Sequence, residues 1–174
     1  MRRVLALMFS LVTLVYADIA TMPWPKALRD FPSGEHARFE TSDYVIAREI
    51  PRDRETQMAG GSGGPIVLIT LHSKKTGQSF ALSPQSGGER LLEDYAGYPQ
   101  LEIWGRGGGG YWTRCLYRFV SGDYRSVRCD EFEEFPRHKN ENATTTHLPF
   151  APRGEGDDRG DTVYFVETRI PEHE

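Results

Sequence analysis

The sequence predicts a single all-β domain with mainly antiparallel strands, arranged as a sandwich, a barrel or a small propeller-like fold. Three observations lead to this prediction. The chain has 18 glycines and 11 prolines, which cluster between apolar segments as they do in turn-rich β proteins. Runs of β-branched and aromatic residues recur between these clusters. The best helical candidate is short, so we expect at most one short helix.

The first 17 residues have the pattern of a cleavable export signal. Arg2 and Arg3 precede an apolar run over 4–16, and Val15-Tyr16-Ala17 places small residues at the two positions that a signal peptidase inspects. The run is shorter than the roughly 20 residues that cross a bilayer as a helix. We therefore expect a signal peptide at 1–17 and a periplasmic or secreted mature protein without a membrane anchor.

The rest of the chain is expected to be one domain. Without residues 1–17, the 174-residue chain keeps 157 residues, with 19 Lys and Arg against 25 Asp and Glu. This acidic balance argues against general nucleic-acid binding, which needs a basic field. We expect an extended N-terminal arm over 18–34 and a single β domain over 35–174, which includes a long polar surface segment over 136–161.

Strands are predicted in order along this domain. Ala37 to Ile50 holds two short β-prone runs, and 52–64 is polar and glycine-rich, as in a mobile loop. Further strands are predicted at 66–72 and 79–82, which form a hairpin, and at 101–104 and 162–168. Ser86 and Glu89 have the spacing of a capping box, which predicts the short helix near 89–95.

The segment 111–132 is predicted to form one long hairpin. Cys115 and Cys129 each lie seven residues from Gly122. A three-residue loop at 121–123, with Val120 opposite Tyr124, makes the two cysteines face each other. Cross-strand Cβ atoms lie about 4.5 to 5.5 Å apart, close enough for a disulfide after modest adjustment. We therefore predict a Cys115–Cys129 disulfide, which an exported compartment would preserve.

Alternation separates two faces of this hairpin. The first face, expected to be the core side, carries Cys115, Tyr117, Phe119, Val127 and Cys129; the second carries Trp112, Arg114, Leu116, Arg118, Tyr124, Arg128 and Asp130. In this register Arg114 lies opposite Asp130, so an ion pair is expected. Exposed Trp, Tyr and Arg are enriched at binding hot spots, so the second face could hold an acidic or carbohydrate partner. The alternative is that a second sheet or the proline-rich segments cover it.

Catalytic and cofactor motifs are weak. Gly105, Gly107 and Gly110 match a GxGxxG pattern, but a strand follows them instead of the helix that a dinucleotide needs, so no cofactor is expected. The five histidines lack metal-site spacing, and no metal is expected. Acidic residues could still supply a glycosidase-like pair, namely two of Glu93, Asp94, Glu102, Asp130, Glu131, Glu133 and Glu134.

A family resemblance starts in the run from Glu93 to Trp104. With the glycines that follow, Tyr111-Trp112, Tyr117-Arg118-Phe119 and Ser121-Gly122-Asp123-Tyr124, it resembles exported bacterial proteins with an FG-GAP-like β-repeat element. Some of those proteins resemble the periplasmic inhibitor of invertebrate-type lysozyme, and others are immunity proteins against peptidoglycan-cleaving effectors. Alignment on Gly97 leaves Asp94 as the one carboxylate at a side-chain ligand position, so calcium is not expected there.

These observations predict a non-catalytic binding protein, with a protein partner such as a lysozyme-like or effector enzyme. An arginine between the two carboxylates of a glycan-cleaving site would block substrate. The expected partner-binding residues flank the hairpin tip or lie in the glycine-rich turn: Arg106, Arg118, Ser121, Tyr124, Arg125 and Arg128. The alternative function is a small exported hydrolase or carbohydrate-processing enzyme that uses paired carboxylates.

Overall fold

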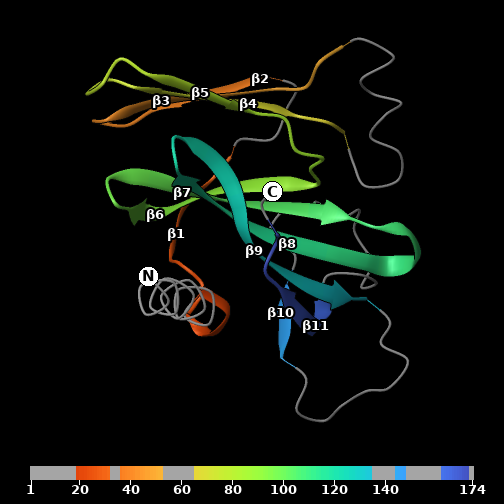
Figure 1. Ribbon diagram of the computed structural model, residues 1–174. Helices are drawn as coiled ribbons and strands as arrows, with labels where there is room; N and C mark the ends of the chain where they lie inside the picture. The colour runs from red at the N-terminus through yellow and green to blue at the C-terminus, as the bar shows by residue number, and fades with distance from the viewer. Residues whose placement is uncertain (1–18, 32–35, 53–64, 135–143, 148–161, 173–174) are drawn as a thin grey trace, which may run out of the picture.

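Residues 19–31, 36–52, 65–134, 144–147 and 162–172 are described by the structure, a computed structural model of the chain (Figure 1). They form two antiparallel sheets, so the all-β prediction is confirmed. The expected signal peptide, nearly all of the 52–64 loop and most of the 136–161 segment lie outside the described residues. Within the described ranges, no helix has the length and apolar character needed to cross a membrane.

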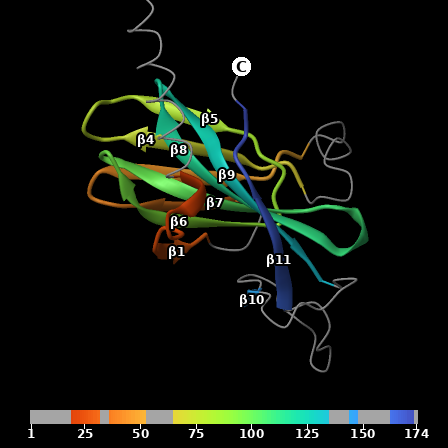
Figure 2. The same ribbon diagram turned by 60° about the horizontal axis from the view of Figure 1, so that its bottom comes forward.

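The large sheet has seven strands in the order β1-β6-β7-β8-β9-β11-β10. These are β1 (Ala27–Asp30), β6 (Gly88–Tyr95), β7 (Tyr98–Arg106), β8 (Tyr111–Val120), β9 (Asp123–Glu133), β10 (Thr145–His147) and β11 (Thr162–Arg169). Strand β1 lies in the segment expected to be an extended arm, and it pairs with β6. At the other edge, β10 and β11 lie below the β8–β9 hairpin, so the sheet curls (Figures 1 and 2).

The small sheet has four strands in the order β2-β3-β4-β5 and stacks above β6 to β9 (Figure 1). Its strands are β2 (His36–Glu40), β3 (Tyr44–Glu49), β4 (Leu68–Ser73) and β5 (Ser79–Leu82). The main core lies between the sheets, where Ile46, Ile69 and Leu71 of the small sheet meet Leu101 and Ile103 of the large one. Face-to-face packing of antiparallel sheets is the sandwich arrangement.

The face of the large sheet that points away from the small sheet, here called the lower face, has its own buried side chains. Trp104 and Phe132 form one cluster with Val163 of β11. Leu92 and Leu116 form another, against which Met22 and Trp24 pack. The N-terminal segment therefore covers part of the lower face.

The β8–β9 hairpin confirms the predicted cysteine pairing and corrects the predicted tip. Cys115 lies opposite Cys129, and the two form a disulfide. Val120 lies opposite Asp123, so the loop has two residues and the predicted three-residue loop is wrong. Positive φ values at Ser121 (54°) and Gly122 (91°) favour this tight turn, whose twist matches that of the strands.

A β-bulge at Val127 reconciles the tip with the rest of the hairpin. Ser126 lies opposite Tyr117 and Arg128 opposite Leu116, which leaves Val127 as the extra residue. The predicted faces of two side chains are therefore exchanged. Tyr124 belongs to the core between the sheets, and Val127 packs on the lower face.

The short helix expected near 89–95 is wrong, because this segment is strand β6. Leu91 is buried between the sheets and Leu92 on the lower face, an alternation that a strand provides and a helix does not. Glu89 does not cap a helix; its carboxylate forms an ion pair with Arg48 of the small sheet, with Nε and Oε2 2.8 Å apart. Helical backbone is found at 19–21 and in a 3₁₀ turn at Gly108–Gly110.

Candidate functional site

The six residues expected to bind a partner do not form one site. Arg106 ends β7, whereas Ser121 and Arg125 belong to the β8–β9 tip. The ten residues of β8 separate these places by roughly 30 Å, at about 3.3 Å per residue. Arg106, in the glycine-rich turn, therefore lies at the far end of the hairpin from Ser121 and Arg125.

Tyr124 lies inside the sandwich. Its side chain packs against Phe80 and Phe119, and the residue is 6% exposed. Its hydroxyl donates a hydrogen bond of 2.9 Å to the carbonyl of Pro99. Burial raises the pKa of Tyr124 far above its usual range. This tyrosine stabilises the core and does not face a partner.

Arg118 is also enclosed, with 7% of its surface exposed. Its Nε donates to Oε1 of Gln100, and its guanidinium lies 4.1 Å from the ring centroid of Tyr95. Its Nη2 contacts Sδ of Met22 at 3.2 Å. Burial lowers the pKa of Arg118. The N-terminal segment and the β6–β7 turn therefore occupy the surroundings expected for a partner.

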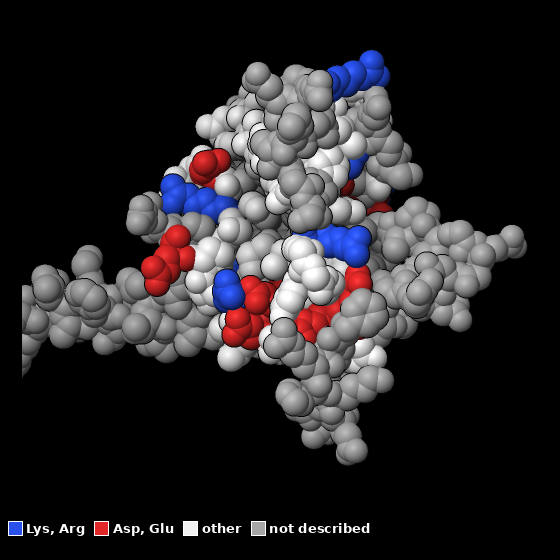
Figure 3. Space-filling view, turned by 90° about the vertical axis from the view of Figure 1, so that its right-hand side faces the viewer, with Lys and Arg blue, Asp and Glu red and all other residues white. Residues whose placement is uncertain are grey.

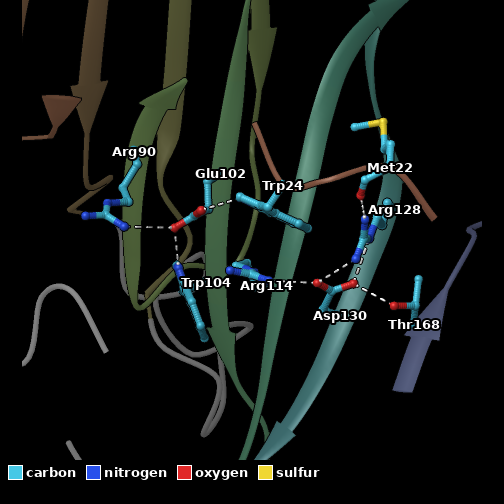
Figure 4. A network of polar contacts seen from close by, with 9 residues as sticks. All are labelled: Met22, Trp24, Arg90, Glu102, Trp104, Arg114, Arg128, Asp130 and Thr168. Atoms are coloured by element: carbon cyan, nitrogen blue, oxygen red, sulfur yellow. Dashed lines mark hydrogen bonds and ion pairs between the residues drawn. The ribbon is translucent and has the colours of Figure 1, made fainter. Parts of the chain in front are cut away.

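Arg128 belongs to an ionic cluster on the lower face (Figure 4). Asp130 accepts hydrogen bonds from Nη2 of Arg114 and Nε of Arg128, each 2.8 Å long, so the predicted Arg114–Asp130 ion pair is confirmed. The hydroxyl of Thr168 donates to the same carboxylate at 2.9 Å. Nη1 of Arg128 donates to the carbonyl of Met22 at 2.6 Å, which fixes the covering segment.

Trp24 completes this cover. Its indole N–H donates to Glu102 at 2.6 Å, and the guanidinium of Arg114 lies 3.9 Å from the Trp24 ring centroid (Figure 4). Glu102 also accepts from the indole N–H of Trp104 at 2.6 Å. Residues 22–24 therefore cover the second face of the hairpin, which agrees with the alternative that a proline-rich segment covers this face.

A different surface is open at the other end of β8. A groove of about 390 Å³ lies beside the β7–β8 connection, and its wall includes Gln85, Arg106, Tyr111, Thr113, Tyr117 and Glu131. We call residues 106–111 the glycine loop. Figure 3 views this end of the molecule, where acidic and basic side chains are interspersed around uncharged surface. The expected residue Arg106 is the one member of the predicted set that reaches this groove.

The glycine loop has a defined shape. Gly107 donates its N–H to the carbonyl of Tyr111 at 2.7 Å. Gly109 and Gly110 have positive φ values of 73° and 84°, which side-chain-bearing residues rarely adopt. The turn presents two exposed side chains, because 53% of the Arg106 side chain and 45% of Tyr111 are accessible.

Arg106 is oriented by its neighbours. Its guanidinium lies 5.5 Å from the ring centroid of Trp112, and its Nη2 lies 3.8 Å from Oε1 of Glu134. The indole N–H of Trp112 donates to the same Glu134 oxygen at 2.6 Å. Glu134 therefore links the aromatic ring and the arginine at one end of the groove.

The carboxylates around this surface have basic or indole partners. Glu131 lies 3.1 Å from Nε of Arg169. Asp94, at the opposite end of the sandwich, has a pKa raised by burial and by the nearby charge of Asp43. No group of three or more His, Cys, Asp and Glu side chains in the described ranges is placed to hold a metal ion.

The sequence pointed to Glu134 only as a possible catalytic carboxylate. It did not point to Gln85 and Thr113 as groove residues or to Met22 and Trp24 as covering residues. Only the three-dimensional arrangement brings them to the groove or to the lower face. Comparison with known proteins found no matching family model, curated protein or solved structure. The geometry of the chain itself therefore carries the functional argument.

Proposed function

We propose that this protein is a non-catalytic binding protein of an exported compartment, and that the glycine loop recognises its protein partner. The observation that carries this proposal is the pair of exposed side chains, Arg106 and Tyr111, on a shaped loop at the rim of a groove. Arg and Tyr are residue types enriched at binding hot spots. The Cys115–Cys129 disulfide supports an oxidising compartment.

The loop is organised before a partner arrives. Trp112 and Glu134 orient the Arg106 guanidinium, which has five N–H donors, and the Glu134 contact of 3.8 Å is too long to be a strong hydrogen bond. Donors therefore remain for an acceptor on a partner. A pre-oriented side chain loses less entropy on binding, which favours affinity.

The partner class that suits this loop is an enzyme with an acidic cleft. Glycan-cleaving enzymes use two carboxylates, and a guanidinium forms strong charge-assisted hydrogen bonds with a carboxylate. The resemblance to lysozyme inhibitors and immunity proteins supports the same choice. We therefore propose an inhibitor or immunity protein against a peptidoglycan-cleaving enzyme, with Arg106 as the blocking residue.

The engaged carboxylates favour a binding protein over the hydrolase alternative. Glu134 and Glu131 are tied to Trp112 and Arg169, and the buried Glu102 and Asp130 are surrounded by indole and guanidinium donors. A retaining or inverting glycosidase needs an acid and a second carboxylate that are both accessible to substrate.

A capture experiment tests the proposed function. Wild-type protein and the double variant Arg106→Ala/Tyr111→Ala are immobilised and exposed to periplasmic extract and to a panel of purified lysozymes. The matched control is Arg125→Ala, which removes an arginine of β9 near the hairpin tip. We expect wild type and the control to capture and inhibit the same enzyme, and the double variant to lose both properties. Full retention by the double variant would place the binding surface elsewhere.

A further inference from the structure

We propose that the groove beside the glycine loop binds a neutral saccharide. This ligand is of a different class from the protein partner proposed above, and the inference does not depend on that partner. The groove volume of about 390 Å³ is at the lower end of the range for small-molecule sites. A short oligosaccharide segment could therefore bury one or two of its rings there.

Two glycines shape the groove. A Cβ atom added to Gly105 would lie 3.1 Å from Oγ1 of Thr113 and 3.8 Å from the carbonyl of Gln85, both groove residues. A Cβ added to Gly107 would lie 3.3 Å from Cβ of Tyr111. Side chains at these two positions would crowd the groove wall, so glycine preserves the space.

The groove wall combines aromatic and uncharged polar groups. Tyr111 and Tyr117 supply flat apolar rings that can pack against the C–H face of a sugar ring. Gln85 and Thr113 supply an amide and a hydroxyl, each of which both donates and accepts hydrogen bonds. Sugar hydroxyls also donate and accept, so these groups can satisfy them in pairs.

The charges of the groove favour a neutral ligand. In the part of the chain that the structure describes, the charged residues of the wall are Arg106 and Glu131, and they have opposite signs. Glu131 is paired with Arg169, and Arg106 lies beside Glu134. A phosphate site would need an excess of donors and positive charge, and a wholly apolar ligand would leave the polar wall without partners.

The floor of the groove is rigid. Cys115 lines it, and the disulfide joins this residue to Cys129 on the neighbouring strand. Thr113, Cys115 and Tyr117 all come from β8, which is paired on both sides. A floor fixed by two strand pairings and a covalent bond needs little reorganisation when a ligand binds.

The test is a titration of the full-length mature protein, followed by tryptophan fluorescence and by calorimetry. The probes are the tetrasaccharide of β-1,4-linked N-acetylglucosamine, the β-1,4-linked glucose tetrasaccharide and an anionic tetrasaccharide of galacturonic acid. We expect saturable binding of at least one neutral probe, and at least tenfold weaker binding of the anionic one. Absence of saturation with both neutral probes, or a preference for the anionic probe, would overturn the proposal.

Variants connect the binding to the groove. We expect Gln85→Ala and Gly105→Ala each to weaken saccharide binding at least fivefold, whereas Arg125→Ala leaves it unchanged. Gln85 is exposed, so its variant reports binding even where Gly105→Ala disturbs folding. Unchanged affinity in a folded Gln85→Ala variant would remove the groove as the site. Capture of an enzyme without saccharide binding would overturn this inference alone, and saccharide binding without enzyme capture would overturn the proposed function alone.

Discussion

Asp130 is the residue on which the buried charges of the lower face depend. It is 1% exposed and accepts hydrogen bonds from Arg114, Arg128 and Thr168. Two guanidinium groups that lie close together on the lower face repel each other unless a carboxylate lies between them. The cluster therefore stabilises the fold as a complete set, and loss of one member leaves the others with uncompensated charge.

Asp130→Asn should lower the free energy of unfolding by about 3 to 5 kcal/mol, because a buried ion pair loses one partner. Urea unfolding followed by tryptophan fluorescence measures this change. The control is Glu131→Gln on the same strand. Its partner Arg169 is 65% exposed, so this ion pair contributes at most about 1 kcal/mol. Equal effects of the two substitutions would show that the cluster does not act as a buried unit.

Two buried tyrosines, Tyr44 and Tyr124, and the half-buried Tyr117 should make the protein sensitive to alkali. Burial raises the pKa of Tyr44, Tyr117 and Tyr124 above the ordinary value of 10.0. A raised pKa in the folded state means that the stabilisation is complete below pH 10 and is lost as the pH rises through the folded-state pKa. We expect these phenols to ionise only as the protein unfolds, which absorbance at alkaline pH detects.

Tyr124→Phe provides the matching substitution. It removes the hydrogen bond to Pro99, at a cost of about 1 kcal/mol at neutral pH. It also removes one group that ionises on unfolding, so stability should fall less steeply above pH 10 than in wild type. A steeper fall would contradict the assignment of Tyr124 to the core.

Side-chain contacts within the hairpin were predictable from the sequence, whereas contacts between the hairpin and the distant N-terminal segment were not. Register alone placed Arg114 opposite Asp130. The partners of Arg118 and Arg128 include Met22, which is 96 and 106 residues away in sequence. Cross-strand alternation carries no information about such a covering segment, so alternation alone predicts that both arginines face a partner.

Among the elements, the β8–β9 turn shows what local chemistry could predict. The two cysteines fixed the middle of the hairpin correctly, since only one register brings them together. The predicted register at the tip is wrong by one residue. The two-residue turn shortens the loop by one residue, and the bulge at Val127 adds that residue to β9. A bulge leaves no clear signal in alternation when both of its neighbours are polar, as Ser126 and Arg128 are.

Gly122→Ala should destabilise the hairpin by about 1 kcal/mol, because Gly122 has a φ of 91° and its surroundings leave space for a methyl group. The cost is therefore a backbone effect. Gly108→Ala is the control, since Gly108 also has free space around its Cβ position but lacks a positive φ. Denaturant unfolding should show a larger loss of stability for Gly122→Ala than for Gly108→Ala. Equal stabilities of the two variants would argue against a strained turn.

The disulfide should contribute about 3 kcal/mol to stability, as expected for a cross-link between residues 14 apart. Cys115→Ala/Cys129→Ala should lower the urea midpoint by the corresponding amount. Reduction of the wild type should give the same midpoint. A reduced wild type as stable as the oxidised protein would show that strand pairing alone holds the hairpin.

Across the whole molecule, the two ends of β8 have different roles. At the tip end, Phe119 and Tyr124 pack into the core between the sheets. At the other end, the glycine loop and the groove remain open. The fold class predicted from composition and alternation is correct, because both are properties of whole strands. The predicted set of partner-binding residues combines the glycine loop with the hairpin tip. The ten residues of β8 hold these two places far apart once the strand is extended.

The most direct test of the central claim is the dissociation constant of the captured enzyme for wild type, Arg106→Ala and Arg125→Ala, measured by calorimetry in one buffer. Recognition through the glycine loop predicts at least tenfold weaker binding by Arg106→Ala, about 1.4 kcal/mol, and a change below about twofold for Arg125→Ala. The reverse order, with Arg125→Ala impaired and Arg106→Ala unaffected, would contradict the account and return the binding site to the hairpin tip.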